Sequence, residues 1–145
     1  MSIWFKPPDI DDLNRLHQNT AVERLGIVIT EVGDDFLRGT MPVDARTVQP
    51  VGLLHGGASV LLAETLGSAA AISCVDLEVF YCVGLDINAN HVRGATSGIV
   101  TGTARPFHLG RTSHVWDIQI ADDADRLVCV ARLTLLVVNQ PQKAP

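Results

Sequence analysis

Hydrophobic residues gather in several runs along this chain, of which most have the composition of strands and one has the length of a helix. Runs rich in β-branched and large apolar residues, each bounded by turn-forming residues, predict β-strands. Two short turns, Gly33-Asp34-Asp35 and Asp122-Asp123-Ala124-Asp125, are expected to join antiparallel neighbours. The strands are expected at residues 27–32, 36–41, 81–89, 98–107, 112–121 and 127–138.

A long run of small and apolar residues interrupts this series of strands. It extends from Gly57 to about Cys74, contains no proline and has the length of a helix. The run is apolar nearly all round, and a helix with so little polar surface has to be enclosed by other elements. We therefore expect a sheet wrapped around this helix, which is an α+β arrangement.

Two shorter helical patterns precede the first strand. Residues 11–17 have a weak helical spacing, and Thr20-Ala21-Val22-Glu23 has the form of a capping box that opens a helix ending at Gly26. A chain of 145 residues with 47% hydrophobic content suits one domain with a substantial core. We predict a single domain over residues 1–145, with a lead-in segment at 1–18 and a frayed tail at 139–145.

Charge and hydropathy exclude several classes of partner. The net charge is −5 and the Lys and Arg residues are scattered singly, which argues against a nucleic-acid surface. The N-terminus lacks the apolar stretch of a signal peptide. The longest apolar run, at 58–75, is shorter than the ~20 residues of a membrane span and contains Glu64. We expect a cytoplasmic protein that binds neither nucleic acid nor membrane.

The cysteines and histidines do not form the motifs of a metal or redox site. Cys74, Cys82 and Cys129 are widely spaced in apolar segments, so we expect reduced core thiols. The histidines show no paired ligand spacing and no cysteine partner, and no metal site is predicted. These histidines are His17, His55, His91, His108 and His114.

One carboxylate, Glu64, stands inside the long apolar run. A buried acid is expensive unless it is paired or needed for function. A His55-Gly56-Gly57 corner precedes the run, and glycines that open a helix leave its first backbone N–H groups free to meet negative charge. A carboxylate together with an oxyanion-binding helix start suggests acyl chemistry. The alternatives are a structural ion pair for Glu64, a capping role for His55 and close packing at the glycines.

Three segments carry a resemblance to a known family. QPVGLLHGGASVLLAETLGS at 49–68, GLDINANHVR at 84–93 and RPFHLGRTSHVW at 105–116 resemble hotdog-fold acyl-CoA thioesterases, in the Glu-dependent branch that includes 4-hydroxybenzoyl-CoA thioesterase. The likeness runs from about Asn19 to Val137. It implies a hotdog fold, in which an antiparallel sheet wraps around one long central helix.

The resemblance also implies roles for individual residues. Glu64 would act as nucleophile or as general base on water, and the Gly56 backbone N–H would polarise the thioester carbonyl. Gln49 and His55 would position the thioester or the attacking group, and Ser68 would support the water or the carboxylate. For Gln49 and Ser68, ordinary loop or helix-packing roles are the alternative.

A second group of residues matches family positions near the pantetheine and nucleotide end of coenzyme A. The alternative for the charged members is that they are solvated surface residues. The group consists of His91, Arg93, His108, Gly110, Arg111 and Thr112.

Helix geometry places Glu64 and Gly56 in different halves of a site. The two residues are eight positions apart, which is about 12 Å along one helix. A catalytic group has to lie within about 3 Å of its target or reach it through one water. One chain cannot bring both to one carbonyl, so we predict a homodimer in which Glu64 of one chain faces Gly56 of the other. The resemblance extends this expectation to a homotetramer.

The resemblance implies hydrolysis of an aromatic acyl-CoA without a cofactor, since coenzyme A is part of the substrate. The best match is a 1,4-dihydroxy-2-naphthoyl group of menaquinone biosynthesis, and proofreading of an aroyl-carrier protein is the alternative. A hotdog hydratase and a non-catalytic acyl-CoA binding protein are the competing classes. We expect the small residues Ala63, Gly67, Ala69 and Ala70 to leave space for a flat aryl group.

Overall fold

The computed structural model describes residues 1–141, which form three helices and six strands. The helices are α1 (Ile10–Leu16), α2 (Ala21–Arg24) and α3 (Gly56–Ser73). The strands are β1 (Val28–Val32), β2 (Leu37–Pro42), β3 (Phe80–His91), β4 (Ile99–Leu109), β5 (Ser113–Ala121) and β6 (Leu127–Asn139). Each predicted element is present, with bounds that differ from the expected ones by at most two residues.

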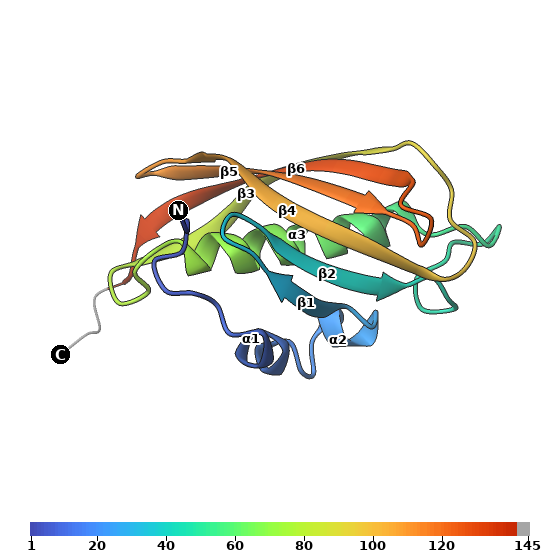
Figure 1. The fold of residues 1–145 in the computed structure, drawn as a ribbon, viewed down its shortest axis with the longest axis horizontal. Helices are drawn as coiled ribbons and strands as arrows, with labels where there is room; N and C mark the ends of the chain where they lie inside the picture. Colours follow the sequence, from blue (N-terminus) through green and yellow to red (C-terminus); the bar gives the residue numbers. More distant parts are fainter. Residues whose placement is uncertain (142–145) are drawn as a thin grey trace.

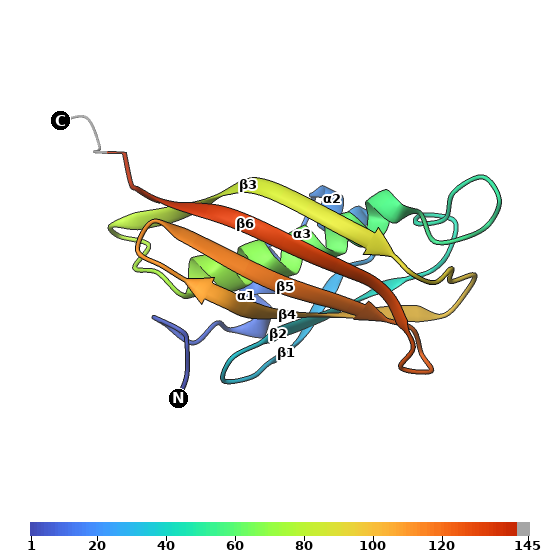
Figure 2. The same cartoon turned by 90° about the horizontal axis from the view of Figure 1, so that it is seen from above.

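The six strands form one antiparallel sheet in the order β1-β2-β4-β5-β6-β3. The sheet curves around α3, as Figures 1 and 2 show from two directions. This arrangement confirms the predicted α+β hotdog fold. Because β3 follows α3 in the chain but pairs with β6, it lies at one edge of the sheet, and β1 lies at the other.

The core lies between α3 and the inner face of the sheet. Trp116, Ile118 and Ile120 alternate along β5 and are completely buried, as the period of two for a strand with one covered face requires. On the helix side, Leu66 lies so close to β4 that a side-chain carbon on Gly102 would be 2.7 Å from it. Glycine at this strand position therefore lets the helix approach the sheet closely.

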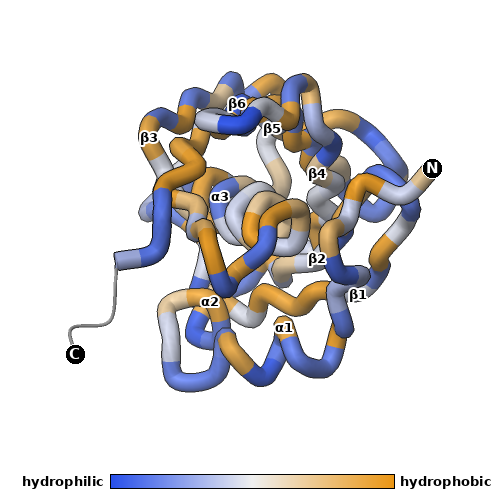
Figure 3. Tube along the Cα trace, turned by 90° about the vertical axis from the view of Figure 1, so that its left-hand side faces the viewer, coloured by the Kyte–Doolittle hydropathy of each residue, from blue (hydrophilic) through white to orange (hydrophobic). Residues whose placement is uncertain are grey.

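The sheet wraps around α3 as expected, and α2 also contacts this helix. Figure 3, a view along the helix, shows α1 and α2 on the side away from the sheet. Leu61, Glu64 and Ser68 lie on the open side of α3 and are only partly buried. The apolar character of this run predicted that α3 is enclosed. It could not predict that two short helices form part of the enclosure.

The lead-in segment is tied to the edge of the sheet at β1. The Asn14 side chain donates to the Ile29 carbonyl at 2.9 Å and accepts from the Ile29 N–H at 2.8 Å. The Thr20 hydroxyl caps α2 by accepting from Val22 N–H, while Glu23 accepts from the N–H of Asn19, one residue before the partner expected of a capping box. The β1 edge is thus satisfied locally by α1.

The C-terminal strand is longer than predicted. Asn139 pairs with Phe80 at the end of β6, and Gln140 N–H donates to the Val79 carbonyl at 2.8 Å. The prediction of a frayed tail from residue 139 onward is therefore wrong for Asn139 and Gln140. Residues 142–145 lie outside the described residues. Within residues 1–141, no helix is long and apolar enough to cross a membrane.

Candidate active site

The first turn of α3 presents one backbone donor without a partner. His55 is the N-cap, and its Nδ1 accepts from Gly57 N–H at 2.8 Å. Its carbonyl accepts from Ala58 and Ser59. Gly56 N–H donates to no described residue, as expected for one of the free N–H groups at a helix start. The capping role weighed for His55 is therefore real, and the free donor is at Gly56.

Gln49, Gly56, His91 and Arg93 line one cavity of about 390 Å³ at this helix start. The Gln49 side-chain oxygen accepts from Val51 N–H at 2.5 Å, which leaves its NH₂ group as a donor. A side-chain carbon on Gly56 would lie 2.8 Å from Nε2 of His91, so only glycine lets this imidazole approach the helix start. The cavity thus brings together four of the predicted residues, all able to donate hydrogen bonds.

Glu64 lies farther along α3 and lines a different cavity of about 400 Å³. Its carboxylate is close to β3, since a side-chain carbon on Gly84 would be 3.1 Å from Oε1. No hydrogen bond or ion pair joins the Glu64 side chain to another residue of the described chain. The residue is only partly buried in one chain, which corrects the picture of a fully desolvated acid. The structural ion pair considered as an alternative is absent from the described residues.

Ser68 follows Glu64 by one helical turn and lines the same cavity. Thr65 also faces this space, but its hydroxyl donates to the Leu61 carbonyl at 2.7 Å. Of the four small residues expected beside an aryl group, only Ala69 lines the cavity. Ala63 and Ala70 are fully buried, and Gly67 packs against Leu133, so these three face the core instead.

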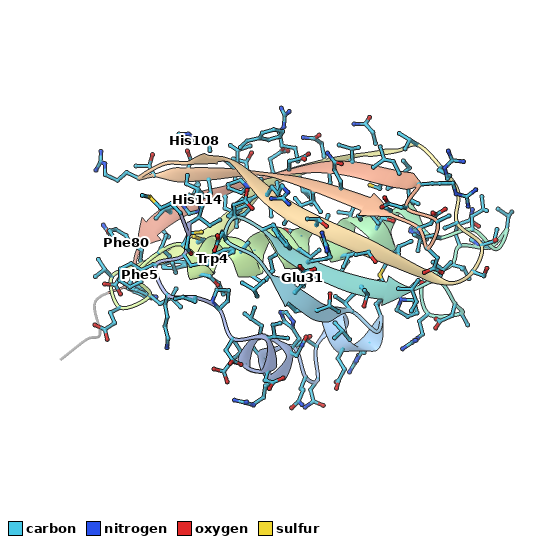
Figure 4. All side chains as sticks on the ribbon, viewed as in Figure 1. Trp4, Phe5, Glu31, Phe80, His108 and His114 are labelled. Carbon is cyan, nitrogen blue, oxygen red and sulfur yellow. The ribbon has the colours of Figure 1, made fainter. Side chains whose placement is uncertain are left out.

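The residues predicted to bind coenzyme A lie at two ends of the molecule. His91 pairs with Cys129 on β6, and Ser113, which follows Thr112, pairs with Leu136. These two positions on β6 are seven residues apart, or about 24 Å along a strand. Figure 4 shows His108 at the same end of the sheet as Phe80, where β3 begins. His108, Gly110, Arg111 and Thr112 therefore cannot share one cavity with His91 and Arg93 in a single chain.

His17, at the end of α1, lines the cavity beside Glu64 but was not predicted there. Its Nδ1 is buried without a hydrogen-bond partner among residues 1–141. Burial lowers the pKa of this imidazole below its ordinary value. Sequence spacing gave no signal for His17, because its place depends on how α1 packs against α3.

The cysteines are free, as expected. Burial, with a smaller contribution from nearby Cys82, raises the pKa of the Cys74 thiol to about 12. Burial also raises the pKa of Cys82 and of Cys129. Across residues 1–141, no three His, Cys, Asp or Glu side chains gather as a metal ion would require, and the absence of a metal cofactor stays a prediction.

Comparison with known proteins identifies the family. Residues 51–129 match the thioesterase superfamily. The Pseudomonas aeruginosa protein PA1618 is 54% identical over 138 residues, covering 95% of both chains. The solved structure of the Q49A mutant of thioesterase PA1618 superimposes with a TM-score of 0.95, covering 96% of this chain and 100% of that one at 52% identity.

Two relatives have more specific names. The 1,4-dihydroxy-2-naphthoyl-CoA hydrolase of Escherichia coli K12 is 48% identical, covering 94% of this chain and 99% of that protein. The proofreading thioesterase EntH of Cronobacter sakazakii is 46% identical, with the same coverage. The fold, the matched region and these relatives agree: the chain belongs to the thioesterase superfamily of hotdog proteins and is an enzyme that hydrolyses thioesters.

Proposed function

We propose that this enzyme hydrolyses an aromatic acyl-CoA, with Glu64 as the catalytic carboxylate and Gly56 N–H as the donor to the thioester carbonyl. The observation that carries the proposal is the pair of unpartnered groups on α3. Gly56 N–H has no acceptor and Glu64 has no cation in the described chain. A free N–H donor and a free carboxylate are the groups that a reaction passing through an oxyanion can use.

The reaction requires a nucleophile, an oxyanion donor and little else. In the general-base route, Glu64 takes a proton from water, whose oxygen bonds to the acyl carbon while negative charge develops on the carbonyl oxygen. The Gly56 N–H and the N-terminal end of the α3 dipole stabilise this charge. The C–S bond then breaks, and the coenzyme A thiolate takes the proton from Glu64. In the alternative route Glu64 attacks the carbonyl itself, the C–S bond breaks to release the coenzyme A thiolate, and water hydrolyses the resulting anhydride to the free acid and Glu64.

The active site is completed by a second copy of the chain. Gly56 and Glu64 are eight residues apart on α3, about 12 Å along the axis, and they line separate cavities. The free edge of β3 is the surface for the second copy. This strand is 12 residues long, and its exposed residues include Tyr81, Val83 and Leu85. An exposed apolar edge of this length is a template for pairing with another strand.

The positions of two residues on β3 set the register of this pairing. Glu64 lies against Gly84, and Gly56 lies against His91 of the same chain. An antiparallel β3 pair related by a two-fold axis near the middle of the strand, at about Asn88, brings Gly84 of one chain close to His91 of the other. That register brings Glu64 of each protomer to the helix start of its partner. Further assembly into a homotetramer stays a prediction.

The substrate class rests on the relatives and on the cavity. The E. coli relative is named for 1,4-dihydroxy-2-naphthoyl-CoA, and the cavity beside Glu64 has mostly apolar walls that suit a flat aromatic group. A thioester on a carrier protein is the second candidate, favoured by the relative named as a proofreading thioesterase. We propose no cofactor, because coenzyme A enters as part of the substrate. The cytoplasmic location stays a prediction.

Steady-state hydrolysis of a panel of aromatic and aliphatic acyl-CoAs, by the parent and by Glu64→Ala, tests the proposal. We expect the parent to favour aromatic groups and Glu64→Ala to lose at least about 10²-fold in kcat, the scale of loss for an essential general base. Glu64→Gln is the matched control, because it keeps the shape and removes the charge. Equal rates for parent and variants would show that Glu64 is not the catalytic carboxylate.

A further inference from the structure

The cavity beside Glu64 is walled by two parts of the chain that the sequence does not place together. One wall is the open side of α3, and the other is the segment from α1 to α2. The second wall is fixed, because Asn14 on α1 makes two hydrogen bonds to Ile29 of β1. The residues that line the cavity are Leu13, Leu16, His17, Ala21, Val22, Leu61, Glu64, Thr65, Ser68, Ala69 and Ile72.

Few polar groups in this cavity are free to meet a ligand. The Thr65 hydroxyl already donates to the Leu61 carbonyl. The His17 ring has no hydrogen bond to any described residue, and its Nδ1 is buried. Nε2 is not among the buried unpartnered atoms, so it is the accessible ring nitrogen of this cavity-lining residue. With Glu64 assigned to the reaction, His17 and Ser68 are the remaining polar side chains for the acyl group.

The chemistry of His17 indicates what kind of group it meets. Burial lowers its pKa, which favours the neutral imidazole, and the open nitrogen then donates or accepts according to its tautomer. A hydroxyl both donates and accepts, so it satisfies either tautomer. The lining contains no Lys or Arg, and Glu64 contributes negative charge, so an anionic substituent is disfavoured. The other walls are mainly apolar and suit a ring.

We propose that His17 is a specificity-determining residue that hydrogen-bonds through Nε2 to a hydroxyl on the acyl group, so that the enzyme prefers hydroxylated aromatic acyl groups to unsubstituted ones. This inference rests on the proposed function, because it needs the acyl group to lie in the cavity beside Glu64.

The test compares benzoyl-CoA with its 2-, 3- and 4-hydroxy derivatives. We expect the parent to prefer at least one hydroxylated substrate by about tenfold in kcat/KM, the upper range for one neutral hydrogen bond. His17→Phe should remove this preference, so that its kcat/KM for the hydroxylated substrates falls to about its own value for benzoyl-CoA. The effect should fall on KM more than on kcat, because the bond is present in both the bound substrate and the transition state.

Two further variants separate recognition from structure. His17→Gln places an amide near the position of Nε2 and should retain most of the preference. His17→Leu should lose the preference, and it replaces His17→Phe in the test if that variant does not fold. The inference is overturned if the parent shows no preference, or if the apolar variants slow all substrates equally. The proposed function fails separately, if Glu64→Ala hydrolyses benzoyl-CoA as fast as the parent.

Discussion

The Glu64 carboxylate rests against the backbone of Gly84, where the absence of a side chain leaves it room. A carbon added to Gly84 would lie 3.1 Å from Glu64 Oε1, tighter than an ordinary van der Waals contact. The register of β3 against β6 shifts between Gly84 and Asp86, so the strand is irregular at this point. Bulges of this kind occur next to active sites, where they re-aim a side chain. Gly84 thus controls where the carboxylate stands.

Gly84→Ala should lower kcat by about tenfold without lowering stability. The added methyl displaces Glu64 by a few tenths of an ångström, and a displacement of about 1 Å costs on the order of 10²-fold in rate. Gly84→Val should have a larger effect. The measurements are steady-state kinetics and thermal unfolding, with Asn90→Ala on the same strand as a control. An unchanged kcat in Gly84→Val would show that the position of Glu64 in this structure is not the catalytic one.

Gly67 is predicted to be required for the approach of α3 to β6. A side-chain carbon there would lie 2.6 Å from Leu133 Cδ2, and Leu133 is fully buried. Overpacking of a core costs about 1 to 3 kcal/mol, more than the helix gains when Ala replaces Gly, which is about 1 kcal/mol. Gly67→Ala should therefore lower the free energy of unfolding, as measured by urea titration.

The matched control for this prediction is Leu133→Val, which removes the methyl group that the new side chain would strike. In the double variant the cost of Gly67→Ala should be smaller than in the parent, because the clash is relieved. Additive effects of the two changes would mean that the contact between Gly67 and Leu133 does not limit the packing.

The sequence predicted the elements well because local chemistry defines them. The Asp122 to Asp125 turn, with Asp125 at φ 59°, joins β5 to β6, and the glycines after His55 open α3. It predicted burial on α3 less well. Leu62 is fully buried and the neighbouring Leu61 only partly, and similar hydropathy cannot tell the two faces apart.

The candidate site was only partly predictable for a related reason. Gln49 and Gly56 are close in sequence and line one cavity, as a local motif allows. His17 lies 47 positions before Glu64, and only tertiary packing brings both to one cavity. His108 and His91 were grouped by resemblance, but His91 ends β3 beside Cys129 of β6, whereas His108 lies on β4 and pairs with Val115 of β5. Spacing in sequence does not determine which edge or end of a sheet a residue occupies.

Stability should fall as the pH drops from 7.5 to 5.5, and His114 is one cause. Burial, with a smaller effect from the charge of His108, lowers the pKa of His114 in the folded chain. The unfolded chain then binds a proton near pH 6.5 that the folded chain does not, so acid favours unfolding. From this group the loss at pH 5.5 is no more than about 1.4 kcal/mol. Urea unfolding of the parent at several pH values measures it.

His114→Phe should reduce this pH dependence, because the new side chain does not titrate. A slope remains from His17, whose pKa burial also lowers. The carboxyl groups of Asp44 and Asp122, whose pKa values are lowered by hydrogen bonds from Arg46 and Arg126, lose their contribution only below about pH 4. An unchanged slope between pH 7.5 and 5.5 in His114→Phe would assign the effect to other groups.

Mixing two inactive variants should restore activity if two chains build each active site. Glu64→Ala lacks the carboxylate, and Gln49→Ala lacks a donor in the cavity that contains Gly56. In a mixed dimer, one site receives both changes and the other receives neither. After random exchange half of the dimers are mixed, so the mixture should recover about a quarter of the parent activity for a two-fold symmetric pair.

Activity is measured after unfolding and refolding the variants together. The control mixes variants refolded separately, which should stay inactive on the time scale of the assay. If Gly56 and Glu64 of the same chain served one carbonyl, every site would carry one of the two changes, and the mixture would be no more active than its components.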